Sequence, residues 1–251
     1  MITIPKTFSA SPGLLDDKVI LVSGATGGFG KATSLALARH GATVVVLARS
    51  LRRVEALYDE IEQAGYPTPA IYPLDLEGAS EQDYADLAIN IESQLGRLDG
   101  MIHCAAMLGT PTLFAQSDAS TWYQVHQVNL HAPYLLTRAC LPLLCKSTRA
   151  SLVFMTDDKT GAYWDAYQVS KQGLAAMARL LAREYEGSSL RVNCYQPGKT
   201  RTALQLRAFP AADENDQLPL PADHENAFLY LMSDQCQSNG ETFIPARSTV
   251  D

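Results

Sequence analysis

The sequence lacks the features that would place the protein in a membrane or on a nucleic acid. No apolar run approaches the roughly 18 residues that a transmembrane helix needs. Basic residues are fewer than acidic ones, 20 Lys and Arg against 27 Asp and Glu, which gives a formal net charge of −7. A negative chain is repelled by phosphate backbones and anionic lipid surfaces. We therefore expect no nucleic-acid partner and no membrane partner.

Cysteine is also scarce, and its arrangement argues against a metal centre. The five Cys are odd in number and scattered, with no Cys-x-x-Cys pair and no His at metal-ligand spacing beside them. The sequence thus predicts no metal site, and we interpret the Cys as buried thiols in a reducing compartment. Residues 1–15 hold a single Lys and no continuous apolar stretch, so they lack the parts of a secretion signal. These features predict a cytoplasmic protein.

Short apolar runs alternate with amphipathic stretches along the whole chain of 251 residues. This alternation predicts an α/β fold, a Rossmann-type doubly wound parallel sheet of about seven strands with helices on both faces, in a single domain spanning residues 1–251. The acidic, Pro-rich stretch 207–221 is interpreted as a mobile loop beside the ligand crevice. Strands are expected at 18–23, 43–48, 70–74, 99–104, 151–155, 190–195 and 241–244, and helices at 29–40, 51–64, 81–95, 119–145 and 164–185.

The loop after the first expected strand carries glycines at positions 24, 28 and 30 and leads into the first expected helix. Glycine permits a tight turn and removes the Cβ that would block a pyrophosphate, while a helix start offers backbone N–H groups to that anion. The alternative is an ordinary Gly-rich turn. The strand before it and the helix after it favour a dinucleotide site formed by Gly24, Thr26, Gly28, Phe29 and Gly30.

The end of the second expected strand indicates which dinucleotide is preferred. A dinucleotide fold reads the ribose 2′-hydroxyl there with an acid, or a 2′-phosphate with a base. This turn has no carboxylate, but it has the guanidinium of Arg49 and the hydroxyl of Ser50. We therefore predict NADP(H) in preference to NAD(H). The alternative is that Arg49 is a solvated loop residue.

Tyr167 and Lys171 are spaced four residues apart within an expected helix, so they share one face. A cation near a phenol favours the phenolate, so we expect Lys171 to lower the pKa of Tyr167 and make it a usable proton donor to a carbonyl. The alternative is a surface pair. The position of the helix, directly after the fifth strand and near the crevice, favours catalysis.

In their order along the chain, these motifs resemble those of the short-chain dehydrogenase/reductase family. The glycine loop, Asp75, Asn129, the Tyr167/Lys171 pair and the segment Pro197-Gly198 with Thr202 all match. The stretches SLVF, LRVNCYQPGKTRTA and AFP are similar to the YciK-like subgroup of bacterial oxidoreductases.

The resemblance implies a role for each matching residue. Tyr167 would be the acid/base, Lys171 would hold the nicotinamide ribose and modify the pKa of the phenol, and Asn129 would hold a proton-relay water. Simpler alternatives are that Asp75 caps a turn, that Asn129 satisfies backbone groups inside its helix, and that Thr202 is an N-cap. Further cofactor contacts would come from Asp75, Leu76, Pro197, Gly198, Thr200 and Thr202.

Two departures from the family pattern affect the expected site. Cys104-Ala105-Ala106 stands where the family usually has Asn-Ala-Gly, and Asp157 stands where the carbonyl-orienting Ser is expected. Because the following loop is shortened, Thr156 could take the Ser position instead.

The resemblance and the motifs predict an NADP(H)-dependent oxidoreductase that moves hydride between nicotinamide and a carbonyl or alcohol substrate. The alternative is an NADP(H)-binding protein with little activity, since the Ser is replaced. Helices 119–145 and 164–185 would pair between subunits in a homodimer or homotetramer. The substrate pocket would be lined by the loop 207–221 and by Met107, Leu108, Tyr163 and Trp164.

Overall fold

A computed structural model describes residues 1–159, 161–211 and 217–246 of the chain. Its centre is a seven-stranded sheet in the order β3-β2-β1-β4-β5-β6-β7, and every neighbouring pair of strands is parallel. The expected doubly wound α/β fold is thereby confirmed. The strands are β1 (Val19–Ser23), β2 (Thr43–Ala48), β3 (Ala70–Pro73), β4 (Gly100–His103), β5 (Ala150–Met155), β6 (Leu190–Tyr195) and β7 (Thr242–Phe243).

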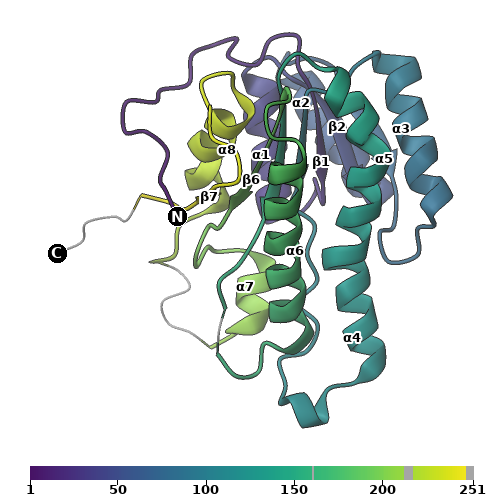
Figure 1. Ribbon diagram of the computed structural model, residues 1–251, viewed down its shortest axis with the longest axis vertical. Helices are drawn as coiled ribbons and strands as arrows, with labels where there is room; N and C mark the ends of the chain where they lie inside the picture. The colour runs from purple at the N-terminus through teal and green to yellow at the C-terminus, as the bar shows by residue number, and fades with distance from the viewer. Residues whose placement is uncertain (160, 212–216, 247–251) are drawn as a thin grey trace.

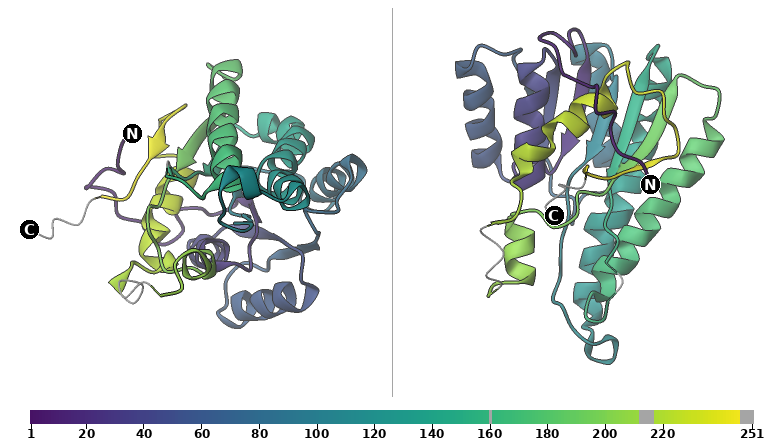
Figure 2. Two further views of the ribbon diagram at one scale, coloured as in Figure 1. Left: turned by 90° about the horizontal axis from the view of Figure 1, so that it is seen from below. Right: turned by 90° about the vertical axis from the view of Figure 1, so that its left-hand side faces the viewer.

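Helices cover both faces of the sheet and make three layers (Figure 1; Figure 2). One face packs against α1 (Gly28–Arg39), α2 (Leu51–Gln63) and α8 (Glu225–Met232). The other packs against α3 (Glu81–Leu95), α5 (Ala132–Lys146) and α6 (Asp165–Glu184). Two apolar cores result, one on each side of the strands.

The alternation of side chains along β1 shows why such runs form buried strands. Ile20 and Val22 belong to the core under α1, α2 and α8, whereas Val19 and Leu21 belong to the core under α3, α5 and α6. A strand that is buried on both faces needs apolar residues at every position. The runs that predicted these strands are therefore continuous rather than alternating.

The single helix expected over 119–145 is interrupted. It divides into α4 (Ala119–His126), a π-helical turn η2 (Gln127–His131) and α5. Pro133 lies in the first turn of α5 and has no N–H, so it cannot donate to the carbonyl of Asn129 four residues earlier. A loss of this kind favours a local π turn over a regular α-helix.

The C-terminal part contains two helices that the sequence patterns did not indicate. α7 (Ala203–Ala208) includes the start of the stretch expected to be a loop, and residues 212–216 of that stretch lie outside the described residues. In α8, every residue from Ala227 to Met232 is buried. A helix that is apolar all round has no amphipathic period to detect.

The buried carboxylate of Asp99 holds the amino-terminal ends of β1 and β4 together. Asp99, which precedes β4, accepts two hydrogen bonds from Arg97, at 2.7 and 2.8 Å, one from the Ser147 hydroxyl at 2.7 Å and one from the Val19 N–H at 3.0 Å. Burial opposes ionisation, but these donors hold the pKa of Asp99 below its ordinary value.

At the edge of the sheet formed by β7, the N-terminal segment pairs with this last strand. The Ile2 N–H donates to the Thr242 carbonyl, and the Ile244 N–H donates to the Ile2 carbonyl, both at 2.9 Å. Among the described residues, no helix is both long enough and apolar enough to cross a membrane.

Candidate active site

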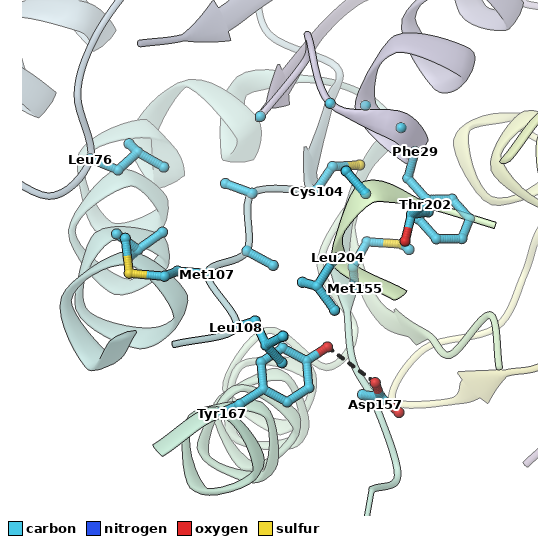
Figure 3. A pocket seen from close by; sticks show the side chains of 18 of the residues that line it. Phe29, Leu76, Cys104, Met107, Leu108, Met155, Asp157, Tyr167, Thr202 and Leu204 are labelled. Atoms are coloured by element: carbon cyan, nitrogen blue, oxygen red, sulfur yellow. Dashed lines mark hydrogen bonds between the residues drawn. The ribbon is translucent and has the colours of Figure 1, made fainter. Parts of the chain in front are cut away.

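A cleft of about 440 Å³ opens at the carboxyl ends of the strands, where the chain order changes direction between β1 and β4 (Figure 3). This is where a doubly wound sheet offers a ligand site. The sequence-predicted residues that line it are Gly24, Thr26, Gly28, Phe29, Gly30, Arg49, Asp75, Leu76, Asp157, Tyr167, Lys171, Pro197, Gly198, Thr200 and Thr202; Ser50 and Asn129 are not among its lining residues.

The glycine loop is shaped by close backbone approaches. Gly24 has φ +65°, and a Cβ there would lie 2.7 Å from the backbone of Ala105. A Cβ on Gly30 would collide with the Gly24 carbonyl oxygen. A Cβ on Gly28 would lie 3.2 Å from the Thr202 methyl group across the cleft. Gly24 and Gly30 therefore permit the turn itself, and Gly28 keeps the cleft open.

The loop ends at a helix start suited to an anion. α1 begins at Gly28, its N-cap Gly27 supplies no side-chain hydrogen bond, and its first turn holds no acidic residue. Its first N–H groups point out of the helix end without intrahelical partners, and the helix dipole adds positive charge there. These features and the space above Gly28 fit a pyrophosphate.

At the end of the cleft beside β2, the exposed Arg49 lies directly after that strand, and Arg53 from α2 also lines the cleft. Ser50 instead occupies the N-cap of α2, where its carbonyl accepts from the N–H groups of Arg53 and Val54. The Asp75 carboxylate accepts from the Glu77 N–H at 3.2 Å, so the residue caps a turn while it lines the cleft.

The Tyr167 hydroxyl donates a 3.1 Å hydrogen bond to the Asp157 carboxylate (Figure 3). Lys171 lies one turn further along α6, where its ammonium group donates to the Met155 carbonyl at 2.8 Å and lies 5.8 Å from the centre of the Tyr167 ring. Thr156 is buried, and its N–H donates to the Tyr195 carbonyl of β6. The structure thus pairs Asp157, rather than Thr156, with Tyr167.

The pKa values of this pair differ from the sequence-based expectation. Burial and the neighbouring Asp157 carboxylate raise the pKa of Tyr167 well above its ordinary value. Burial lowers the pKa of Lys171 to about 8, against the opposing effect of Asp157. The expected lowering of the Tyr167 pKa is therefore wrong, because burial and Asp157 raise it. Tyr167 is held protonated, as a proton donor must be.

Asn129 lies beneath the cleft in the π turn and is completely buried. Its side chain accepts from the Met107 N–H at 2.7 Å and donates to the Met107 carbonyl at 2.9 Å and the Ser170 hydroxyl at 3.0 Å. The side chain therefore satisfies backbone groups outside its own helix. It fixes the loop after β4 against α6, which carries Tyr167.

The buried imidazole of His224 fixes the segment that follows β6. His224 approaches the Tyr195 hydroxyl at 2.7 Å with Nδ1 and the Thr200 hydroxyl at 3.1 Å with Nε2. Thr202 is the N-cap of α7 and accepts from the Gln205 N–H at 3.2 Å, as the simpler alternative predicted. Sequence reasoning missed His224, since nothing in its neighbourhood indicates a distant partner.

The substrate side of the cleft is apolar and aromatic with a basic rim. Met107, Leu108 and Trp164 line it as expected, whereas Tyr163 does not line it and is 56% exposed with φ +75°. Arg207, the first residue of the stretch 207–221, also lines it as expected. The sequence missed further lining residues from α7 and the shortened loop, which are Leu204, Gln205 and Lys159. The Ala203–Ala208 run of helix formers behind an N-cap Thr was the signal for the first two.

The altered segment after β4 leaves an unreactive thiol in the cleft wall. Cys104, Ala105 and Ala106 all line the cleft. Burial raises the pKa of the Cys104 thiol to about 12, so the thiolate is not formed at neutral pH. We assign this Cys no chemistry.

The glycine turn at a helix start, a Tyr and a Lys one helical turn apart, and the cleft that they share at the strand ends are typical of a nucleotide-binding oxidoreductase of the short-chain type. A family model of short chain dehydrogenases matches residues 18–212. The chain belongs to this family, and it is similar to YciK in particular.

Three known proteins illustrate the similarity. The uncharacterized oxidoreductase YciK of Escherichia coli K12 is 39% identical over 235 residues, which are 92% of each chain. A solved structure assigned to the short chain dehydrogenases, from Pseudomonas syringae, has a TM-score of 0.92 at 40% identity and covers 94% of this chain and 98% of its own. Another, from Escherichia coli CFT073 in complex with NADPH, has a TM-score of 0.89 at 39% identity and covers 92% and 98%.

Proposed function

We propose that the protein is an NADPH-dependent reductase that converts a carbonyl group into an alcohol, with Tyr167 as the proton donor. The observation that carries this proposal is the buried Tyr167 hydroxyl, which donates to Asp157 in the same cleft as Lys171 and the glycine loop. A phenol held protonated suits reduction, in which the oxygen of the substrate gains a proton, better than oxidation, in which a base must remove one.

NADPH, when bound, supplies the hydride that the carbonyl carbon accepts as the C=O double bond is reduced to CH–OH and the cofactor becomes NADP⁺. Gly24, Thr26, Gly28, Phe29 and Gly30 would hold the pyrophosphate end, and Arg49, with Arg53, the 2′-phosphate. Asp75 and Leu76 would contact the adenine, and Pro197, Gly198, Thr200 and Thr202 the nicotinamide half. Ser50 keeps only a supporting place in the turn, beside Arg49.

Two chain residues would serve Tyr167 directly. Lys171 would hold the nicotinamide ribose and return a proton towards the phenol, which its pKa of about 8 permits near neutral pH. Asn129 would hold a proton-relay water for Tyr167, and its side chain fixes the loop after β4.

Steady-state consumption of NADPH with a panel of ketones and diketones tests the proposal. The alternative function, cofactor binding with little activity, is favoured by one observation, which is that Asp157 occupies the place beside Tyr167 where a donor is expected. A binding protein would change NADPH fluorescence without consuming the cofactor, whereas a reductase consumes it only when a carbonyl compound is present.

We also infer a homodimer or homotetramer in a reducing, cytoplasmic compartment. The support is the apolar exposure on α5 and α6, where Tyr134, Val169 and Leu180 are 48, 49 and 57% exposed, and the five free Cys. Light scattering of the purified protein coupled to size-exclusion chromatography measures the subunit number.

A further inference from the structure

We propose that Asp157 selects substrates that carry a hydroxyl group on the carbon next to the reducible carbonyl. This inference rests on the proposed reductase function and goes beyond it by naming the substrate class. The starting observation is the 3.1 Å hydrogen bond from the Tyr167 hydroxyl to the Asp157 carboxylate, inside the cleft.

As a carboxylate, Asp157 differs from a hydroxyl group in what it offers to a carbonyl oxygen beside Tyr167. A carboxylate accepts hydrogen bonds and donates none, so it cannot hold a carbonyl oxygen as a hydroxyl group would. During reduction the carbonyl oxygen gains negative charge, and a carboxylate beside it repels that charge. When a simple ketone accepts the hydrogen bond of the Tyr167 hydroxyl, Asp157 loses that hydroxyl as its donor.

A neighbouring hydroxyl group on the substrate removes both difficulties. While the carbonyl oxygen accepts from Tyr167, the hydroxyl donates to Asp157 and replaces the donor that the carboxylate loses. Oxygens on adjacent carbons lie within about a hydrogen-bond length of each other, which matches the 3.1 Å between the Tyr167 and Asp157 oxygens. The pair therefore presents one donor and one acceptor at the spacing that a hydroxy ketone complements.

The charges around the cleft favour a hydroxyl group over an ammonium group as this donor. Lys171, Lys159 and Arg207 line the same cleft. These positive charges would repel a cationic substrate, whereas they do not repel a neutral hydroxyl group.

The rest of the substrate faces an apolar and aromatic wall. Leu108 and Trp164 line the same cleft as Tyr167, and the Trp164 ring lies 5.9 Å from the Tyr167 ring and 5.7 Å from the Phe209 ring. A flat apolar group fits such a wall. An aryl hydroxymethyl ketone combines both parts.

The test compares three ketones that differ at one group, 2-hydroxyacetophenone, 2-methoxyacetophenone and acetophenone, with NADPH. The methoxy compound keeps the inductive effect of the oxygen and lacks the donor. We expect kcat/KM for the hydroxy ketone to exceed that for the methoxy ketone by about tenfold or more, because the lost contact is a hydrogen bond to a charge. Calorimetric binding of both ketones to the NADP⁺ complex gives a readout without turnover and should show the same order.

Variants assign the preference to one carboxylate. In Asp157→Ala the hydroxy-to-methoxy ratio should fall to within about twofold, and Asp157→Asn, which keeps the shape without the charge, should lose most of it. Asp158→Ala is the matched control, since Asp158 is an exposed neighbour with the same charge that does not line the cleft; it should keep the ratio. Unchanged NADPH binding shows that the variants are folded.

The outcomes separate this inference from the proposed function. Equal reduction of the hydroxy and methoxy ketones by the unaltered protein, or a preference that survives in Asp157→Ala, overturns the inference and leaves the reductase in place. If the protein binds NADPH but neither consumes it with any of the three ketones nor binds the hydroxy ketone in its NADP⁺ complex, both proposals fail.

Discussion

Replacing Arg49 by Ala should weaken the binding of NADPH and leave that of NADH nearly unchanged. Arg49 follows β2 at the end of the cleft that it shares with Arg53, in a turn with no carboxylate to bind a ribose 2′-hydroxyl. Only NADPH carries a 2′-phosphate, so only NADPH has a charge to lose when the guanidinium is removed.

The expected size of the effect follows from the exposure of Arg49. A hydrogen bond to a charged group contributes about 1.5–3 kcal/mol. Because the Arg49 side chain is exposed and screened by water and salt, we take about 1.5–2 kcal/mol, which is about a 10- to 30-fold increase in the Kd of NADPH. Arg53 lines the same end and preserves part of the attraction. The Kd of NADH should change less than about twofold.

Fluorescence titration of both cofactors against both proteins measures these constants, at low and at moderate salt. Arg52→Ala is the matched control, because Arg52 is equally exposed and charged but does not line the cleft. Equal weakening of both cofactors in Arg49→Ala, a comparable loss in Arg52→Ala, or a preference of the unaltered protein for NADH would refute the assignment.

Three further substitutions test the catalytic groups and the fold. Tyr167→Phe should leave NADPH binding intact and reduce kcat by at least about a hundredfold, whereas Lys171→Met should impair both; normal turnover in the Phe variant would make Tyr167 a packing residue. Asp157→Ser should speed single-turnover reduction of simple ketones about tenfold, roughly 1.4 kcal/mol, while Thr156→Val leaves it unchanged; the reverse pattern would place Thr156 at the carbonyl. Asp99→Asn should lower the free energy of unfolding by about 2 kcal/mol at neutral pH in urea titrations. Because the pKa of Asp99 is lowered in the folded state, this difference should shrink as the pH falls below about 3.8, and a constant difference would contradict the assignment.

The sequence predicted which residues around the glycine loop come together at the cleft because that part is built from local chain geometry. Buried parallel strands require apolar residues at every position, so their ends and the loops that follow them can be located. Gly24 and Gly30 are needed by the turn itself, and Tyr167 and Lys171 share a helix face by their spacing alone. Each of these features depends on residues close together in the chain.

The remaining features depend on partners that are distant in the sequence. The side chain of Asn129 is fixed by the Met107 backbone, which lies in the loop after β4. The Thr200 hydroxyl is bound by His224, which lies 24 residues further along the chain. The direction of the Tyr167 pKa shift depends on burial and on how close Asp157 lies, and neither quantity follows from spacing. The spacing of four residues on a helix correctly predicted that Tyr167 and Lys171 are neighbours. It did not predict which neighbouring group would set the direction of the Tyr167 pKa shift.

The two ends of the cleft are built from different kinds of chain feature, so a substitution at one end can leave the other unchanged. The end beside the glycine loop consists of backbone N–H groups and the space above Gly28, which a side-chain change elsewhere does not alter. The other end consists of side chains from the short loop after β5 and from α7, among them Asp157, Trp164 and Leu204. A substitution in that loop changes the donor or acceptor beside Tyr167 without moving the sheet, because β5 is buried along its whole length and fixed on both sides by β4 and β6. In the reductase that we propose, a Ser donor in place of the Asp157 acceptor should therefore change which carbonyl compounds react, while the glycine-loop end of the cleft stays as it is.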